Sequence, residues 1–207
     1  MTETRAFIFA RGGSKGIIGK NLVKFNGLPL IAHSILIAKK INSIEKIYVS
    51  TDSDQIADIS SEYGVSIIKR PKKLATDDSP EWLSWQHAIK DSIKNDGNFA
   101  KFISLPTTAP LRIESDIKKC LNALNNKVDI VITASESKRS PWFNMITIDS
   151  NGFTKLLIDN GSYARRQDTP NCFDLSTIAY VSTPKFILNN NRIWEGNVAT
   201  VLIPPER

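Results

Sequence analysis

The 207-residue sequence has little of several residue types that define functional classes. It contains two cysteines, Cys120 and Cys172, and two histidines, and neither cysteine has a CxxC partner. This scarcity argues against a disulfide framework or a cysteine-based zinc site, and it favours a reducing, cytoplasmic location. No apolar run approaches the roughly 18 residues that a membrane span requires, so we expect no membrane association. The N-terminus also lacks the basic and apolar regions of a signal peptide.

Repeats, low-complexity segments and linkers are absent as well, so we expect a single domain over residues 1–207. The net charge is +6, and the excess is placed unevenly. Residues 1–50 carry eight basic and two acidic side chains, whereas the rest of the chain carries equal numbers of each. A protein that binds nucleic acid would spread basic and aromatic residues over one face. The local excess therefore indicates a small anionic ligand and no nucleic acid.

Segments typical of strands and helices alternate along most of the chain. The expected strands cover residues 6–10, 46–51, 65–68, 102–105, 129–134, 177–181 and 198–203, and the expected helices cover residues 29–41, 54–63, 80–94, 114–125 and 184–190. Such alternation is typical of helices packed on both faces of a parallel sheet. We therefore predict an α/β fold of three αβα layers with a mostly parallel, Rossmann-like nucleotide-binding sheet.

Residues 140–175 depart from this alternation. Residues 144–149 and 153–158 flank Ser150-Asn151-Gly152, which predicts a β-hairpin with an Asn-Gly turn. The neighbouring segment at residues 141–145, Pro-Trp-Phe-Asn-Met, is too apolar for a solvated loop and indicates an interface or a pocket wall. We expect this part of the chain to form a late excursion from the sheet.

The strongest chemical feature follows the first expected strand, where residues 11–16 are Arg-Gly-Gly-Ser-Lys-Gly. Glycine turns let backbone N–H groups approach phosphates closely, and the two bases can neutralise phosphate charge. The spacing is neither that of a Walker A loop nor that of a dinucleotide-binding fingerprint. Two interpretations stay open at this point: a phosphate-binding loop, and a surface glycine turn with solvated bases.

This loop and several later segments resemble the acylneuraminate cytidylyltransferases, which are the CMP-sialic acid synthetases and their relatives. The matching segments are ARGGSKGI at residues 10–17, Lys20-Asn21, GLPLIAH at 27–33, Ser50–Asp52, Arg70-Pro71, Leu74-Ala75, Asp77–Ser79, Pro110–Arg112, Arg165–Asp168 and Tyr180. The resemblance covers residues 5–206. It implies transfer of CMP from CTP to an acidic 2-keto sugar of the sialic, legionaminic or amino-octulosonic type, with release of pyrophosphate.

The resemblance also implies roles for individual residues. The catalytic groups at the triphosphate would be the cationic side chains of Arg11, Lys15 and Lys20. The nucleotide would be bound by Gly12, Gly13, Ser14, Asn21, Arg70 and Ser79. The acidic sugar would be bound by Arg165, Arg166, Gln167 and Tyr180.

Several of these residues also have a plain structural explanation, which stays open. Lys20 could be solvated, Ser79 could cap the helix that follows Pro80, Arg165 could pair with Asp168 or Asp174, and Tyr180 could pack in the core. Asp52, at the end of an expected strand, could approach the nucleotide or cap a turn. Trp82 and Trp85 have the spacing of core or interface residues on one helix.

Two features depart from the family pattern. The segment Pro106–Arg112 lacks the glutamine that commonly precedes it in sialic acid synthetases, which favours a relative acting on another sugar acid. The sequence also stops at Arg207, before the Asp-x-Asp motif that binds Mg²⁺ in the family, so we expect an incompletely represented chain. Mg²⁺ is still the expected cofactor, with ligands that this sequence does not identify. The resemblance further implies a homodimer formed with residues 140–175.

Two other functions stay open. Nucleotidyltransferases that act on a hexose 1-phosphate also place glycine, arginine and lysine after their first strand, and their acceptor would not need Arg165 or Arg166. A nucleotide-binding module without a complete metal site would bind CTP but show no turnover.

Overall fold

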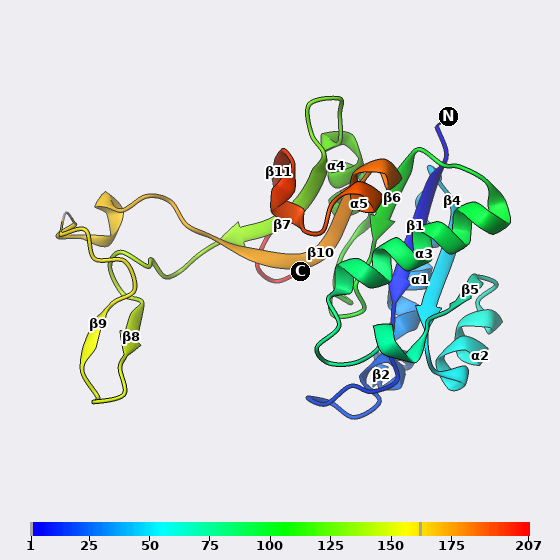
Figure 1. The fold of residues 1–207 in the computed structure, drawn as a ribbon, viewed down its shortest axis with the longest axis horizontal. Coiled ribbons are helices and arrows are strands. Elements are labelled where there is room, and N and C mark those ends of the chain that lie inside the picture. The colour runs from blue at the N-terminus through cyan, green and yellow to red at the C-terminus, as the bar shows by residue number, and fades with distance from the viewer. Residues whose placement is uncertain (1, 162) are drawn as a thin grey trace.

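The computed structural model describes residues 2–161 and 163–207, which are arranged around a seven-stranded sheet (Figure 1). The strand order is β11-β7-β10-β6-β1-β4-β5. The strands are β1 (Thr4–Phe9), β4 (Ile44–Thr51), β5 (Ser66–Lys69), β6 (Lys101–Ser104), β7 (Ile130–Glu136), β10 (Phe173–Ser182) and β11 (Val198–Leu202). Only β10 runs antiparallel to its neighbours in this sheet. The predicted mostly parallel α/β sheet is confirmed.

Helices cover both faces of the sheet, which makes three layers. They are α1 (Leu30–Lys39), α2 (Asp54–Glu62), α3 (Glu81–Asp96), α4 (Glu114–Ala123) and α5 (Pro184–Asn189). Helices α1, α2 and α4 contribute Ile35, Ile56 and Ile117 to one buried cluster. Helices α3 and α5 contribute Trp85 and Ile187 to another. Strands covered on both sides must be apolar on both faces, and this explains the continuous apolar runs of the sequence.

The shorter elements lie around this frame. They are β2 (Lys24–Phe25), β3 (Leu28–Pro29) and the 3₁₀-helices Lys20–Leu22, Lys72–Leu74, Arg166–Asp168 and Ile193–Glu195. The Trp82 and Trp85 side chains are both buried, so their spacing marks core packing. Among residues 2–161 and 163–207, no helix has the length and apolar character needed to cross a bilayer.

A fully buried arginine fixes the end of α3. Arg5 donates from Nη1 to the Ser92 carbonyl at 3.0 Å and from Nη2 to the Asp96 carbonyl at 2.9 Å. Its guanidinium also lies 4.6 Å from the centre of the Phe99 ring. The last carbonyls of a helix have no partner within the helix, so Arg5 satisfies the Asp96 carbonyl, which would otherwise be unpaired, and gives the Ser92 carbonyl a second donor. One of the bases in the N-terminal charge excess is therefore structural.

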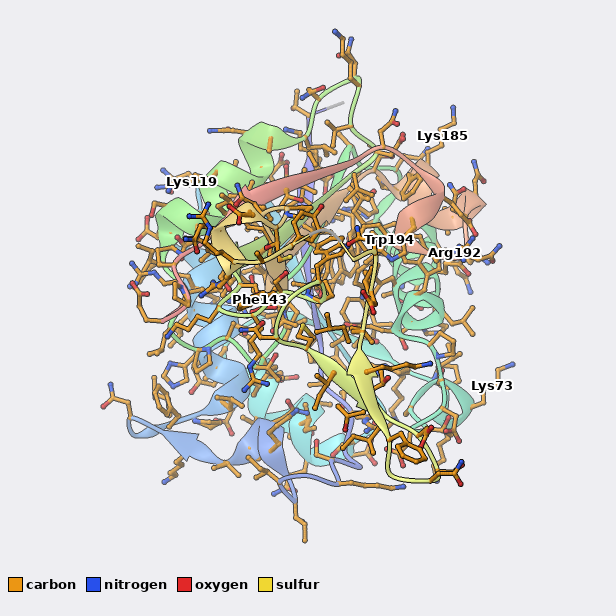
Figure 2. All side chains as sticks on the ribbon, turned by 90° about the vertical axis from the view of Figure 1, so that its left-hand side faces the viewer. Lys73, Lys119, Phe143, Lys185, Arg192 and Trp194 are labelled. Atoms are coloured by element: carbon orange, nitrogen blue, oxygen red, sulfur yellow. The ribbon has the colours of Figure 1, made fainter. Side chains whose placement is uncertain are left out.

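The segment between β7 and β10 forms an arm, residues 137–161 and 163–172, that projects from the body (Figure 1). It carries the hairpin of β8 (Ile146–Ile148) and β9 (Thr154–Leu156), which pair antiparallel. The predicted hairpin is present with shorter strands, and Gly152 in its turn has a φ of 85°. Figure 2 views the molecule from the side of the arm, with Phe143 in front of the body.

Candidate nucleotide-binding cleft

A cleft of about 610 Å³ opens where several strands of the sheet end. It is lined by Phe9, Arg11, Ser14, Lys15, Gly16, Ile17, Lys20, Asn21, Arg70, Leu74, Thr76, Asp77, Ser79, Glu81, Ser84, Pro106, Thr107, Thr108, Thr177 and Tyr180. Phe9 is the last residue of β1, Arg70 follows β5, and Pro106–Thr108 come after β6. Ligands of open α/β sheets bind at the carboxyl ends of the strands, and this cleft has that position.

The glycine-rich loop after β1 brings two cations to one carboxylate. Arg11 Nη2 lies 2.7 Å from Asp77 Oδ1, and Lys15 Nζ lies 2.5 Å from Asp77 Oδ2. Hydrogen bonds from Lys15 and Arg11 lower the pKa of Asp77 below its ordinary value. Two cations that converge on one small anion form the arrangement that a phosphate group needs. Sequence reasoning missed the Asp77 contact because it joins loops separated by more than sixty positions.

Polar contacts fix the position of this loop. Asp52 Oδ1 accepts a hydrogen bond from the Gly12 N–H at 2.9 Å. The Asn21 side chain is buried, donates to the Arg11 carbonyl at 2.9 Å and accepts from Thr107 Oγ1 at 2.7 Å. Asp52 therefore caps the glycine turn. Of its two predicted roles, this is the structural one and not the approach to the nucleotide. Asn21 joins the loop to the end of β6 and so positions Arg11.

Polar and aromatic groups share another wall of the cleft. Arg70 is 8% exposed, and its Nε and Nη2 donate to Ser50 Oγ at 3.1 Å and to the Ser50 carbonyl at 2.6 Å. Burial lowers the pKa of Arg70 to about 10, a value at which it is still cationic at neutral pH. Tyr180 packs with its ring centre 5.3 Å from that of Trp85, and burial raises its pKa. Tyr180 thus packs in the core through its ring and also lines the cleft.

Ser79 does not have the helix-capping role that its position suggested. Pro80 occupies the N-cap position of α3, and the buried Ser79 Oγ has no hydrogen-bond partner among the described residues. The N-cap interpretation is therefore wrong, because α3 begins one residue later than the cap would require. Buried hydroxyls are normally hydrogen-bonded, so an unpaired one on a cleft wall fits a site that takes a polar ligand. The predicted catalytic residue Lys20 lines the cleft as well, whereas its neighbour in sequence Lys24 does not.

The residues predicted to bind the sugar do not all lie at this cleft. Arg166 and Gln167 line a second cavity of about 340 Å³ on the arm, with Arg139, which sequence reasoning missed. Arg166 Nη2 donates to the Ser137 carbonyl at 2.9 Å. Arg165 forms a two-pronged pair with Asp168, at 3.0 Å and 2.8 Å. Only Tyr180 of the four predicted sugar-binding residues lines the main cleft.

The residues of the cleft do not form a ready metal site. Among the described residues, no three side chains of the types His, Cys, Asp and Glu come together to hold a metal ion. Both oxygens of Asp77 are engaged by Lys15 and Arg11, and Asp52 Oδ1 accepts from Gly12. Mg²⁺ usually takes one or two free carboxylates together with substrate phosphates. No reaction step is therefore assigned to a metal held by these residues.

Replacing Asp77 by alanine should tighten the binding of inorganic triphosphate severalfold, because Arg11 and Lys15 would no longer be paired. Isothermal titration calorimetry without divalent cations measures this change. The depressed pKa of Asp77 keeps the two pairs intact at neutral pH, and they are lost as the pH falls through that pKa. Asp78→Ala is the control, since Asp78 is exposed and does not line the cleft. Equal affinities of Asp77→Ala and wild type would contradict the expectation.

A cation-bearing glycine loop at the carboxyl edge of a mostly parallel α/β sheet defines a nucleotide-binding class of protein. The family model described as cytidylyltransferase matches residues 6–180, so the chain belongs to the cytidylyltransferase family. It is a CTP-dependent nucleotidyltransferase, and the predicted resemblance is confirmed.

Curated relatives and solved structures are similar to this chain. The chain is 34% identical to the post-translational flagellin modification protein B of Campylobacter coli, over 98% of this chain and 87% of the relative. It is also 34% identical to the CMP-N,N'-diacetyllegionaminic acid synthase of Campylobacter jejuni, over 95% of this chain and 84% of the relative. The structure of a CMP:2-keto-3-deoxy-manno-octonic acid synthetase complexed with CTP superposes with a TM-score of 0.70, covering 98% and 90% of the two chains. At 14% identity that likeness shows the fold.

Proposed function

We propose that this chain transfers CMP from CTP to the anomeric hydroxyl of a 2-keto sugar acid and releases pyrophosphate. The observation that carries the proposal is the convergence of Arg11 and Lys15 on one carboxylate at the head of the cleft. A triphosphate that displaces Asp77 would meet both cations in place. The relatives whose names include CMP-sugar acid synthase support a sugar acid of the legionaminic or a similar type as the acceptor.

Each group of the cleft has a role in this reaction that its position supports. Arg11, Lys15 and Lys20 would neutralise the charge that builds up on the triphosphate as the bond to pyrophosphate breaks. Ser14, Asn21 and Ser79 would position the nucleotide, and Gly12 and Gly13 would allow the close turn. Because phosphoryl transfer requires little covalent work from the protein, positioning and charge account for the catalysis. We also propose that Mg²⁺ enters with the nucleotide.

The test is release of pyrophosphate from CTP with a panel of 2-keto sugar acids in the presence of Mg²⁺. We expect release with at least one acid and none with hexose 1-phosphates of the same concentration. A control reaction without acceptor measures CTP hydrolysis. The proposal would be overturned if pyrophosphate were released only with hexose 1-phosphates. It would also be overturned if no acceptor of either class led to release.

The arm supports a second part of the proposal, a homodimer. Its exposed apolar side chains include Ile148, 67% exposed, and Phe153, 73% exposed. Monomers rarely expose contiguous apolar patches of this kind, and a second copy with the same arm would cover them. In such a dimer the arm would carry Arg165, Arg166 and Gln167 toward the cleft of the partner, where a carboxylate sugar needs cations. We propose a cytoplasmic location, which the unpaired Cys120 and Cys172 support.

Phe153→Asp should convert the dimer to a monomer, because it replaces an exposed apolar side chain of the arm by a charge. Sedimentation velocity at micromolar concentration measures the mass. Trp194→Asp is the matched control, since Trp194 is 65% exposed and belongs to the 3₁₀-helix Ile193–Glu195, which is not part of the arm. A wild-type monomer, or a Phe153→Asp protein that is still dimeric, would refute this part of the proposal.

A further inference from the structure

A carboxylate and a guanidinium face the same part of the cleft but do not touch. Glu81 is the first residue of α3 and Arg70 follows β5, and both line the cleft. No nitrogen of Arg70 comes within 4.0 Å of a Glu81 carboxylate oxygen to make an ion pair in the described part of the chain, although each charge acts on the pKa of the other group. Because they do not pair with each other, both charged groups are available to a ligand in the cleft.

Each of the two groups is held from behind and keeps polar capacity for the cleft. Ser50 accepts from Nε and Nη2 of Arg70, and among the described residues no hydrogen bond engages Nη1. Glu81 Oε1 accepts from Trp85 Nε1 at 3.3 Å, which orients the carboxylate and occupies one oxygen. Glu81 is exposed at the cleft, and among the described residues no hydrogen bond engages its Oε2, so this oxygen can accept from a ligand.

The aromatic surroundings suit a flat ring. The Arg70 guanidinium lies 5.5 Å from the centre of the Phe9 ring, and Tyr180 lies beside Trp85 on the same side of the sheet. The cations of the glycine loop, by contrast, converge on Asp77. Phosphates would therefore bind at Arg11 and Lys15, and the base of the nucleotide at Arg70 and Glu81.

We infer that Glu81 is a specificity-determining residue that accepts a hydrogen bond from the exocyclic amino group of cytosine, while Arg70 donates to the acceptors of the same ring edge. Cytosine presents a donor beside two acceptors, which complements a carboxylate beside a guanidinium. Uracil presents a carbonyl oxygen where cytosine has the amino group, so its O4 would face the carboxylate and leave it unpaired. Glu81 would thus reject UTP as well as bind CTP. The inference rests on the proposed function, because it assumes that CTP occupies this cleft.

Calorimetric dissociation constants for CTP and UTP test the inference without any sugar. Wild type should prefer CTP, and Glu81→Gln and Glu81→Ala should reduce the ratio of the two constants about 10- to 100-fold, the value of one base-specific contact. The ratio is measured within one protein sample, so a partly unfolded variant does not distort it. Asp78→Asn, which removes an exposed charge from the same segment, should leave the ratio unchanged.

The outcomes separate this inference from the proposed function. An unchanged ratio in both Glu81 variants would overturn it, and so would an equal loss of CTP and UTP binding, which indicates a general electrostatic or structural effect. If wild type binds CTP selectively but releases no pyrophosphate with any acceptor, the proposed function fails and the role of Glu81 stands. If wild type binds neither nucleotide, both fail.

Discussion

Replacing Arg11 by alanine should lower kcat/KM for CTP by about 10²- to 10³-fold, the usual loss when one preorganised group that stabilises developing charge is removed. Arg11 lines the cleft, and its guanidinium lies 2.7 Å from the Asp77 carboxylate. Its backbone is held by Asn21, so the side chain loses little freedom when a phosphate replaces Asp77. Steady-state pyrophosphate release measures the effect.

Two further variants show whether the planar fork of Arg11 matters beyond its charge. Arg11→Lys keeps the charge but cannot hold two oxygens at once, so we expect it to fall between alanine and wild type. Lys24→Ala removes a base from the same region of the chain that does not line the cleft, and it should leave kcat/KM within a factor of about two. An Arg11→Ala enzyme as active as Lys24→Ala would remove Arg11 from the catalytic machinery.

Arg5→Ala should destabilise the protein by about 3 kcal/mol, the cost of removing one member of a buried charged network. The change leaves the Asp96 carbonyl at the end of α3 without its donor, removes one of two donors from the Ser92 carbonyl, and opens a void beside Phe99. It also frees Glu3, whose pKa is lowered chiefly by its hydrogen bond from Arg5. Thermal unfolding should show a Tm lower by roughly 10 °C for a chain of this length.

A surface arginine provides the comparison for Arg5. Arg192 pairs with Glu195 at 3.4 Å, and its side chain is 72% exposed. Exposed pairs contribute little, so Arg192→Ala should change the free energy of unfolding by less than about 0.5 kcal/mol. Similar losses in the two variants would show that burial of the Arg5 guanidinium has no special energetic weight.

Local patterns in the sequence were sufficient for most of the fold. The run Ala6–Phe9 is apolar because β1 is covered on both faces, and Gly64, with a φ of 65°, follows α2 where a left-handed residue is needed. The glycine loop could also be predicted, since its cations are neighbours in the chain. Arg11 and Lys15 accordingly line the cleft together.

Contacts between distant segments could not be predicted in this way. Arg5 was counted with the cations of the N-terminal region, and nothing in its local sequence distinguishes a buried helix partner from a solvated base. Glu81 occupies the first turn of a helix, where an acidic residue is ordinary and gives no signal of a ligand. Arg166 and Gln167 lie on the predicted excursion, but their sequence did not show that they line a cavity separate from the main cleft, because that depends on how far the pairing of β7 and β10 carries them.

The place of β10 has a consequence for the order in which the chain can fold. Within the sheet, β7 and β11 join the other strands only through β10, which pairs with β6 on one side and β7 on the other. Strands β1, β4, β5 and β6 can assemble once residues up to Ser104 are available, but the edge of β6 stays open until residues 173–182 arrive. Sheet closure thus depends on contacts far apart in sequence, which form slowly and leave an aggregation-prone edge meanwhile. Because Thr177 and Tyr180 of β10 line the cleft, the strand that covers the open edge of β6 also completes the cleft during synthesis.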